Sequence, residues 1–138
     1  MAGTNTLTSR VFVDIGKKAN RRTVEVVTVD WVADSADATV PTLSLPLEGF
    51  LIKAITNPGA TAPSANYDIT LTDPEDSALD AAASLLINRH TSTTEQVYPL
   101  ISGAACPILL AGTYGIAVAG NAVNSATGRI IFYLADGI

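Results

Sequence analysis

Apolar and polar residues alternate along most of this chain with a period of two, which is the pattern of β-strands whose two faces differ. The clearest run is residues 22–33, where Glu25, Val27, Val29 and Trp31 share one face and β-branched residues are abundant. Further strands are expected at residues 10–15, 39–47, 49–56, 67–72, 95–100, 107–111, 114–119 and 128–135. Turn residues separate these runs roughly every 8–12 residues, which predicts an all-β antiparallel β-sandwich, a jelly roll of about eight strands.

Three segments add detail to this pattern. In residues 77–88 a serine, an aspartate three residues later and an alanine-rich apolar stripe predict one short helix. Residues 1–9 are small and polar and are expected to form an extended tail. Proline has no N–H to donate to a neighbouring strand, so Pro41 and Pro46 place their strand at a sheet edge or between two bends.

Charge divides the chain into two parts. Five basic residues and the single acid Asp14 give residues 1–22 a charge of +4, which leaves −9 for residues 23–138 because the total is −5. The basic residues are Arg10, Lys17, Lys18, Arg21 and Arg22. We therefore expect residues 1–22 to be a basic N-terminal arm with a first short strand, and residues 23–138 to be the β-sandwich domain.

The arm is expected to meet an acidic surface on a partner; the alternative is a solvated loop. Nucleic acid is not expected as the partner, because no aromatic residues interleave with the basic ones and the acidic body would repel phosphates.

The composition indicates a surface that a partner covers. Only 15% of the residues are charged and 48% are apolar, whereas charged residues average about 25% in soluble domains. An apolar surface without a partner promotes association. The alternative explanation for the composition is the abundance of small alanine and threonine residues. If the partner is another copy of the chain, the choice between a homodimer and a homotrimer stays open.

Candidate chemistry is sparse. Cys106 and His90 are the only cysteine and histidine, so no internal disulfide, catalytic triad or zinc site can be assembled from them. Cys106 is expected to be a small buried residue and His90 an exposed loop residue. Four acids cluster without the spacing of a calcium loop, and we interpret them as turn and helix-capping residues: Asp73, Glu75, Asp76 and Asp80.

Phosphate-loop, nucleophile-elbow and zinc-protease motifs are absent from the sequence. Four aromatic residues are expected to be core or cross-strand residues, with a sugar or peptide groove as the alternative: Trp31, Tyr67, Tyr114 and Tyr133. We therefore expect no enzymatic activity, no cofactor, no metal and no small-molecule substrate. The first ten residues lack the apolar segment of a signal peptide and no run reaches about eighteen apolar residues, so a soluble protein made in a cytoplasm, without a membrane partner, is expected.

One loop is unusual because it is stiff and uncharged. In the sequence NPGATAPSANYDITLTD, which begins at Asn57, Pro58 fits the second position of a turn and Gly59 is expected where positive φ is required. Pro63 keeps the following residues extended. A proline-stiffened loop loses less conformational entropy on docking, so we expect this loop to bind a partner.

The segment from Gly49 to Asp73, GFLIKAITNPGATAPSANYDITLTD, resembles small virion proteins of tailed bacteriophages. The chain as a whole is similar to the jelly-roll cement (decoration) proteins of phage heads. This resemblance implies a virion structural protein that binds the outer surface of the head, bridges major capsid proteins and associates with copies of itself.

The residues expected to bind the capsid or another copy are Arg10, Lys17, Lys18, Arg21, Arg22, Asn57, Pro58, Gly59 and Pro63. The alternative function is a phage tail or fibre component with a receptor- or glycan-binding β-sandwich. Head or tail placement and the position on the capsid lattice stay open.

Overall fold

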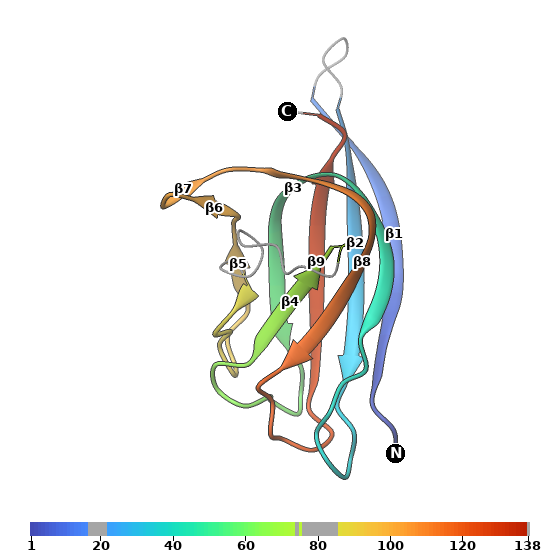
Figure 1. Ribbon diagram of the computed structural model, residues 1–138, viewed down its shortest axis with the longest axis vertical. Coiled ribbons are helices and arrows are strands. Elements are labelled where there is room, and N and C mark those ends of the chain that lie inside the picture. Colours follow the sequence, from blue (N-terminus) through green and yellow to red (C-terminus); the bar gives the residue numbers. More distant parts are fainter. Residues whose placement is uncertain (17–21, 74, 76–85, 138) are drawn as a thin grey trace.

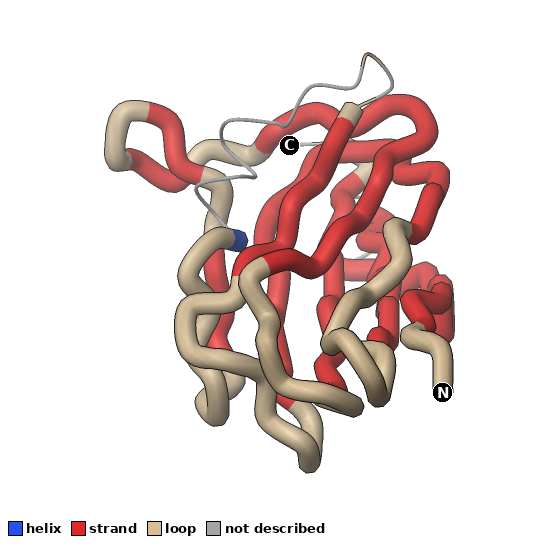
Figure 2. The backbone as a smooth tube through the Cα atoms, turned by 60° about the horizontal axis from the view of Figure 1, so that its bottom comes forward, coloured by secondary structure: helices blue, strands red, loops and turns tan. Residues whose placement is uncertain are grey.

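The computed structural model describes residues 1–16, 22–73, 75 and 86–137, and strands make up most of this part of the chain (Figures 1 and 2). Its nine strands are β1 (Thr4–Ile15), β2 (Arg22–Val32), β3 (Leu43–Pro58), β4 (Asp68–Thr72), β5 (Glu95–Val97), β6 (Leu100–Ile101), β7 (Ala104–Ala105), β8 (Ile108–Ala119) and β9 (Thr127–Ala135). All strand pairings are antiparallel. The expected all-β antiparallel class is confirmed.

Strand β3 belongs to two sheets. Its residues 43–51 pair with β8 and its residues 50–58 pair with β9, and in Figure 1 it curves over the upper end of the molecule between the two. The bend is at Gly49, which has a φ of 120° and lies where a Cβ would come within 2.7 Å of the Ala135 carbonyl oxygen. Both the positive φ and the close approach require glycine, so this residue allows one strand to turn a corner between sheets.

The strand order β1-β2-β9-β3-β8-β4, with β5 beside β3, is continuous through β3, and the bend in β3 folds this seven-stranded sheet into two packed layers. We call the layer of β1, β2, β9, the second half of β3 and β5 the large sheet, and the layer of the first half of β3, β8 and β4 the small sheet. Strands β6 and β7 form a separate two-stranded pair. From β2 onward, successive strands of the chain lie in the large and the small sheet by turns, except that β6 and β7 belong to neither. This alternation makes the fold a jelly-roll sandwich.

The core fills the space between the inner faces of the sheets, where alternate residues of β2, β3, β4, β8 and β9 are buried. Fully buried side chains of the large sheet include Val27, Val29 and Trp31 of β2 and Ile130, Phe132 and Leu134 of β9. Those of the small sheet include Leu47, Ile69, Leu71, Leu110 and Ile116. The rings of Trp31 and Tyr67 meet across the core with their centroids 5.8 Å apart.

Several expected boundaries were wrong. Strand β1 begins at Thr4 and pairs with β2 as far as Ile15, so most of the expected tail is part of the large sheet. The expected strands at 39–47 and 49–56 are parts of β3, and those at 107–111 and 114–119 are parts of β8, because a glycine bend does not interrupt strand pairing. The predicted helix at 77–88 lies largely outside the described residues.

Pro46 agrees with the expectation for an edge strand. It lies in the first half of β3, which pairs with β8 on one side and with no strand on the other among the described residues. The missing N–H of proline therefore breaks no strand pairing there.

Three loops are joined to one another at the lower end of the sandwich, where loops gather (Figure 2). Asn121 joins them, because its Nδ2 donates to the Ala38 carbonyl oxygen over 3.2 Å and its Oδ1 accepts from the Ser64 backbone N–H over 3.1 Å. The Ser64 hydroxyl accepts in turn from the Ala122 backbone N–H over 2.8 Å. These bonds fix the loop that follows β3.

Candidate functional site

The large sheet carries apolar residues on its outer face as well as on its inner face. In β2, Val27, Val29 and Trp31 point into the core, while Val24 and Val26 point outward and are only half-buried. Strand pairing aligns outward residues of the neighbouring strands with them. We call this surface the apolar face and define it as Val11, Val13, Ile15, Val24, Val26, Ile52, Ile131 and Tyr133.

A groove of about 530 Å³ runs along the apolar face. Among the described residues its lining contains two cations, Arg22 and Lys53, and no carboxylate. The Lys53 ammonium lies 4.6 Å from the centre of the Tyr133 ring and donates to Gln96 Oε1 over 2.9 Å. An ammonium at this distance from an aromatic ring is attracted to it, so the groove is apolar along its floor and positive at its edge.

The other half of the same outer face is polar. Arg129 Nε donates to Asp30 Oδ1 over 2.7 Å, and Thr8 Oγ1 donates to Asp30 Oδ2 over 2.6 Å. The bond from Arg129 keeps the pKa of Asp30 below its ordinary value of 3.8, and partial burial opposes that effect. This half therefore satisfies its own charges, whereas on the apolar face Lys53 lies over Tyr133 and Val11, Val13 and Ile15 stay exposed.

The outer face of the small sheet is built from small and polar residues. Its outward positions are Ser44, Pro46 and Glu48 of β3, Thr113, Gly115 and Ala117 of β8, and Thr70 and Thr72 of β4. Leu109, with 64% of its area exposed, is the large apolar exception. A sheet that faces water on one side normally shows this alternation, so the small sheet is suited to solvent.

The structure places one of the predicted basic residues at the groove. Arg22 is exposed and lines it, whereas Arg10 lies on the opposite side of β1 and is engaged within the chain. Arg10 Nη2 donates to Glu25 Oε1 over 2.9 Å and Nη1 donates to the Pro46 carbonyl oxygen over 2.7 Å. The predicted residues Lys17, Lys18 and Arg21 lie outside the described residues.

The second predicted group, Asn57 to Gly59, lies at the far end of the large sheet. Pro58 pairs with Gly128, and the Gly59 backbone N–H donates to the Thr127 carbonyl oxygen over 2.8 Å. Positive φ at Gly59 was a wrong expectation: glycine is needed because a Cβ there would come within 2.0 Å of Thr127 Oγ1. Pro63 is buried, and its carbonyl oxygen accepts from the Thr91 hydroxyl.

Arg22 and the second predicted group do not meet. On β9, Gly128 pairs with Pro58 and Ala135, seven residues later, pairs with Val24. Arg22 lies two residues beyond Val24, so it is about nine residues further along the sheet than Pro58. At about 3.3 Å per residue the separation is about 30 Å. Any partner that contacts both groups must therefore extend along the length of the large sheet.

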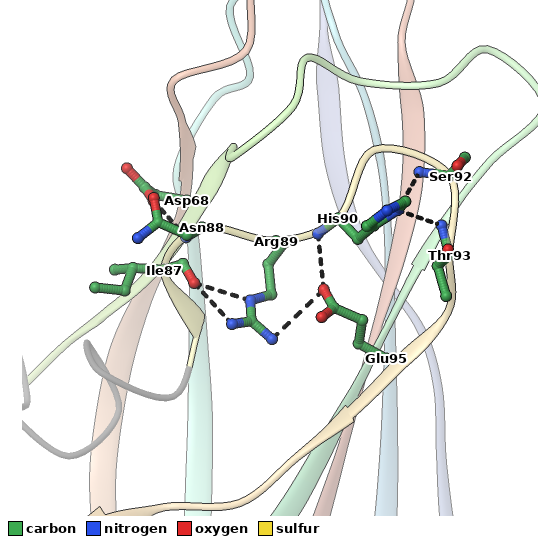
Figure 3. A network of polar contacts seen from close by, with 8 residues as sticks. All are labelled: Asp68, Ile87, Asn88, Arg89, His90, Ser92, Thr93 and Glu95. Carbon is green, nitrogen blue, oxygen red and sulfur yellow. Dashed lines mark hydrogen bonds and ion pairs between the residues drawn. The ribbon is translucent and has the colours of Figure 1, made fainter.

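The densest polar network lies at residues 87–95 (Figure 3). Arg89 Nε and Nη2 both donate to the Ile87 carbonyl oxygen, over 3.0 and 2.7 Å, and Arg89 Nη1 lies 3.6 Å from Glu95 Oε1. Glu95 Oε1 also accepts from the His90 backbone N–H over 2.7 Å. His90 Nδ1 accepts from two backbone N–H groups, those of Ser92 and Thr93.

These bonds give the network a role in shaping the turn. A ring nitrogen that accepts from the backbone N–H groups of its own turn is already occupied. His90 is exposed, as expected. Beside the network, burial above all, with the Glu95 charge adding to it, raises the pKa of Tyr67 to about 12.

The remaining candidate residues are separate. Within residues 1–16, 22–73, 75 and 86–137, no three His, Cys, Asp or Glu residues are grouped as a metal site would require. Cys106 is only half-buried. Trp31, Tyr67 and Tyr114 are core residues, while Tyr133 faces outward beside Val26 and Lys53. In the described part of the chain no helix has the length and apolar character to span a membrane.

The apolar face was missed as a site, although the sequence carries a signal for it. Residues 24–29 read Val-Glu-Val-Val-Thr-Val, so valines occupy both faces of one strand. A strand that is apolar on both faces is typical of a sheet that is covered on both sides.

Comparison with known proteins adds little to this description. No family model and no curated protein matches the chain. Among solved structures, a cupin domain from Bordetella pertussis matches with a TM-score of 0.26 and 12% identity, over 91% of this chain and 92% of that one. At that TM-score the match carries no argument, and the fold rests on the strand pairing of the chain itself.

Proposed function

We propose that this protein is a virion structural subunit, a capsid cement (decoration) protein that binds the outside of a phage head and bridges major capsid proteins. The observation that carries the proposal is the apolar face on the outer side of the large sheet. The resemblance of residues 49–73 to small virion proteins of tailed phages gives the class of partner.

The shape of the apolar face suits a protein surface. It extends over β1, β2, β9 and β3, and its residues stand on paired strands. Contiguous exposed apolar patches on soluble proteins mark interaction sites. Because the strands already fix these side chains, little conformational entropy remains to be lost on docking.

The charges at the groove favour an acidic partner. Arg22 and Lys53 border it, and no carboxylate of the part of the chain that the structure describes lines it, so acidic groups of a shell would be attracted there. A lattice of identical subunits presents the same site many times, and bridging two of them raises the effective affinity of each modest contact.

The proposed role is not enzymatic. The side chains that most resemble catalytic groups, Arg89, His90 and Glu95, hold backbone atoms of their own turn. A base or nucleophile must instead reach a substrate proton or carbon. The proposal includes no cofactor and no small-molecule substrate.

The deciding experiment binds purified protein to phage heads that lack it, with its position on the particle determined by cryo-electron microscopy. The test variant is Val24→Glu with Val26→Glu on the apolar face, and the matched control is Thr70→Glu with Thr113→Glu on the small sheet. We expect at least tenfold less test variant per head and no change for the control, because a buried carboxylate without a partner is costly.

Equal binding of both variants would exclude the apolar face as the docking surface. Density on the tail or a fibre would favour the alternative function, and absence from the particle would overturn the virion role. Circular dichroism of both variants separates lost docking from lost folding.

A further inference from the structure

Strand β1 leaves one edge of the large sheet open. It is the terminal strand in the sheet order and pairs only with β2 among the described strands. Its beginning is covered, because Asn5 Nδ2 donates to the Pro41 and Ile116 carbonyl oxygens over 3.1 and 3.0 Å. From Ser9 to Ile15 the strand has no neighbouring strand on its outer edge in the described part of the chain.

This edge lacks the usual protection against pairing. Natural edge strands are kept apart by shortness, proline, bulges or several charges. Strand β1 has 12 residues, and its one irregularity lies between Leu7 and Ser9. Beyond it Val11, Phe12, Val13 and Ile15 are 51%, 69%, 43% and 46% exposed.

We propose that a second copy of this chain pairs with this edge, with its own β1 antiparallel and a two-fold axis at Phe12. In this register Phe12 lies opposite Phe12 of the second copy, and Val11 lies opposite Val13. Arg10 of each copy then lies opposite Asp14 of the other. The edge is therefore complementary to itself in charge as well as in apolar character, as an isologous interface requires.

Neighbouring registers lack this match. A two-fold axis at Arg10 would place two guanidinium groups opposite each other, and an axis at Val13 would place Phe12 opposite Asp14. Like charges directly opposite each other on paired strands are destabilising. The Phe12 register is the one that gives both ion pairs.

The side chains are able to form these pairs. Arg10 has five N–H groups, and three of them donate to Glu25 and Pro46 within its own chain. Asp14 is exposed, and its Oδ1 accepts from the Thr23 hydroxyl over 3.3 Å. Carboxylates accept several hydrogen bonds, so this one leaves capacity for the second copy.

Pairing would also extend the apolar face. Val11 and Val13 point outward with Val26 and Val24 of β2. Two paired β1 strands would join two large sheets into one, so the apolar faces of both copies would become continuous. This contact uses the strand edge instead of the outer face, so it does not depend on the proposed binding to a head.

The first test measures the mass of the purified full chain by light scattering after size exclusion, up to hundreds of micromolar. We expect twice the 14.3 kDa of one chain. Phe12→Asp should weaken the dimer at least tenfold by placing two carboxylates at the axis. Leu109→Asp, at an equally exposed position on the small sheet, should leave it unchanged.

The second test identifies the register by disulfide formation in a Cys106→Ser background. At the two-fold axis Phe12→Cys places two sulfurs within reach, since antiparallel partners have Cα atoms about 4.5–5.5 Å apart. Val13→Cys faces Val11 of the other copy and should cross-link at least tenfold more slowly. A monomer or trimer at all concentrations, a dimer indifferent to Phe12→Asp, or equal cross-linking at both positions would overturn the proposal.

Discussion

The two sheets of this sandwich share one core and differ on their outer faces. The small sheet alternates apolar residues inward with threonine, serine and alanine outward. The large sheet has Val24 and Val26 outward beside the buried Val27 and Val29 of the same strand. Folding alone requires one apolar face per sheet, so the second apolar face of the large sheet is the feature that supports the proposed binding role.

The outer face of the large sheet shows the same contrast between its own two halves. Its lower outer half carries the Asp30–Arg129 ion pair, and its upper half carries the apolar face. The difference shows that the strand pairing itself tolerates polar residues there. The apolar residues above are therefore not needed to form the sheet.

The largest expected effect compares one glycine in each sheet. At Gly128 a Cβ would lie 2.5 Å from Trp31 ring carbons, whereas at Gly115 the nearest atom is Thr42 Cγ2 at 3.4 Å. Trp31 is fully buried and its ring would have to shift to admit the new methyl group, so Gly128→Ala should reduce the free energy of unfolding by about 3 kcal/mol. Gly115→Ala should change it by less than about 1 kcal/mol.

Urea unfolding of both variants measures this contrast. Equal decreases in the free energy of unfolding for the two variants would show that the inner packing of the large sheet is no tighter than that of the small sheet. An unchanged Gly128→Ala variant would contradict the close packing of Trp31 on β9.

An intermediate effect is expected where the inner faces of the two sheets meet, at Tyr67. Burial raises the pKa of Tyr67 from 10.0 to about 12, so the folded state keeps a proton that the unfolded state loses. Stability is therefore complete below pH 10 and falls as pH rises toward 12, by about 2–3 kcal/mol in total. Urea unfolding at several pH values between 9 and 12 measures this loss of stability. The Tyr67→Phe variant should lack this part of the pH dependence.

If the Tyr67→Phe variant still loses the full amount of about 2–3 kcal/mol of stability at alkaline pH, as much as the unaltered protein, the ionisation of another group causes the loss. The result separates the shared core from the polar half of the large sheet, because the pKa of Asp30 is lowered from its ordinary value and that of Arg129 is raised from its own.

The smallest expected effect is at the polar half of the large sheet. The pKa of Asp30 is lowered by Arg129, so the pair stabilises the fold above pH 3.8 and this contribution is lost as pH falls through the lower folded value. Both side chains are partly exposed, at 47% and 35%, which limits the contribution at neutral pH to less than about 1 kcal/mol. Asp30→Asn should lose this amount at pH 7 and progressively less as pH falls from 3.8 through the lower folded value, as followed by thermal unfolding.

A loss above about 2 kcal/mol for Asp30→Asn would contradict the view that this half of the face is dispensable for folding. The matched variant Thr8→Val removes the second hydrogen bond to the same carboxylate and should cost less than Asp30→Asn.

The candidate site was predicted only in part. Arg22 was selected for its charge, and the structure places it beside the groove. Arg10 was selected for the same reason, but the antiparallel pairing of β1 brings it to Glu25, which no local pattern indicates. The turn expected at Asn57 was wrong, because β3 continues through Asn57 and Pro58, which pair with Arg129 and Gly128. The reason for Gly59 lies in Thr127, far away in the chain.

The sequence by itself determined the all-β class, the antiparallel pattern and the absence of a catalytic motif, because side-chain alternation and turn residues act over a few neighbours. Only the tertiary structure decided that β3 serves two sheets, that the first strand forms an open edge and that valines of two strands combine into one face with residues of β3 and β9. Each of these depends on contacts between residues far apart in sequence, which alternation along a single strand does not contain.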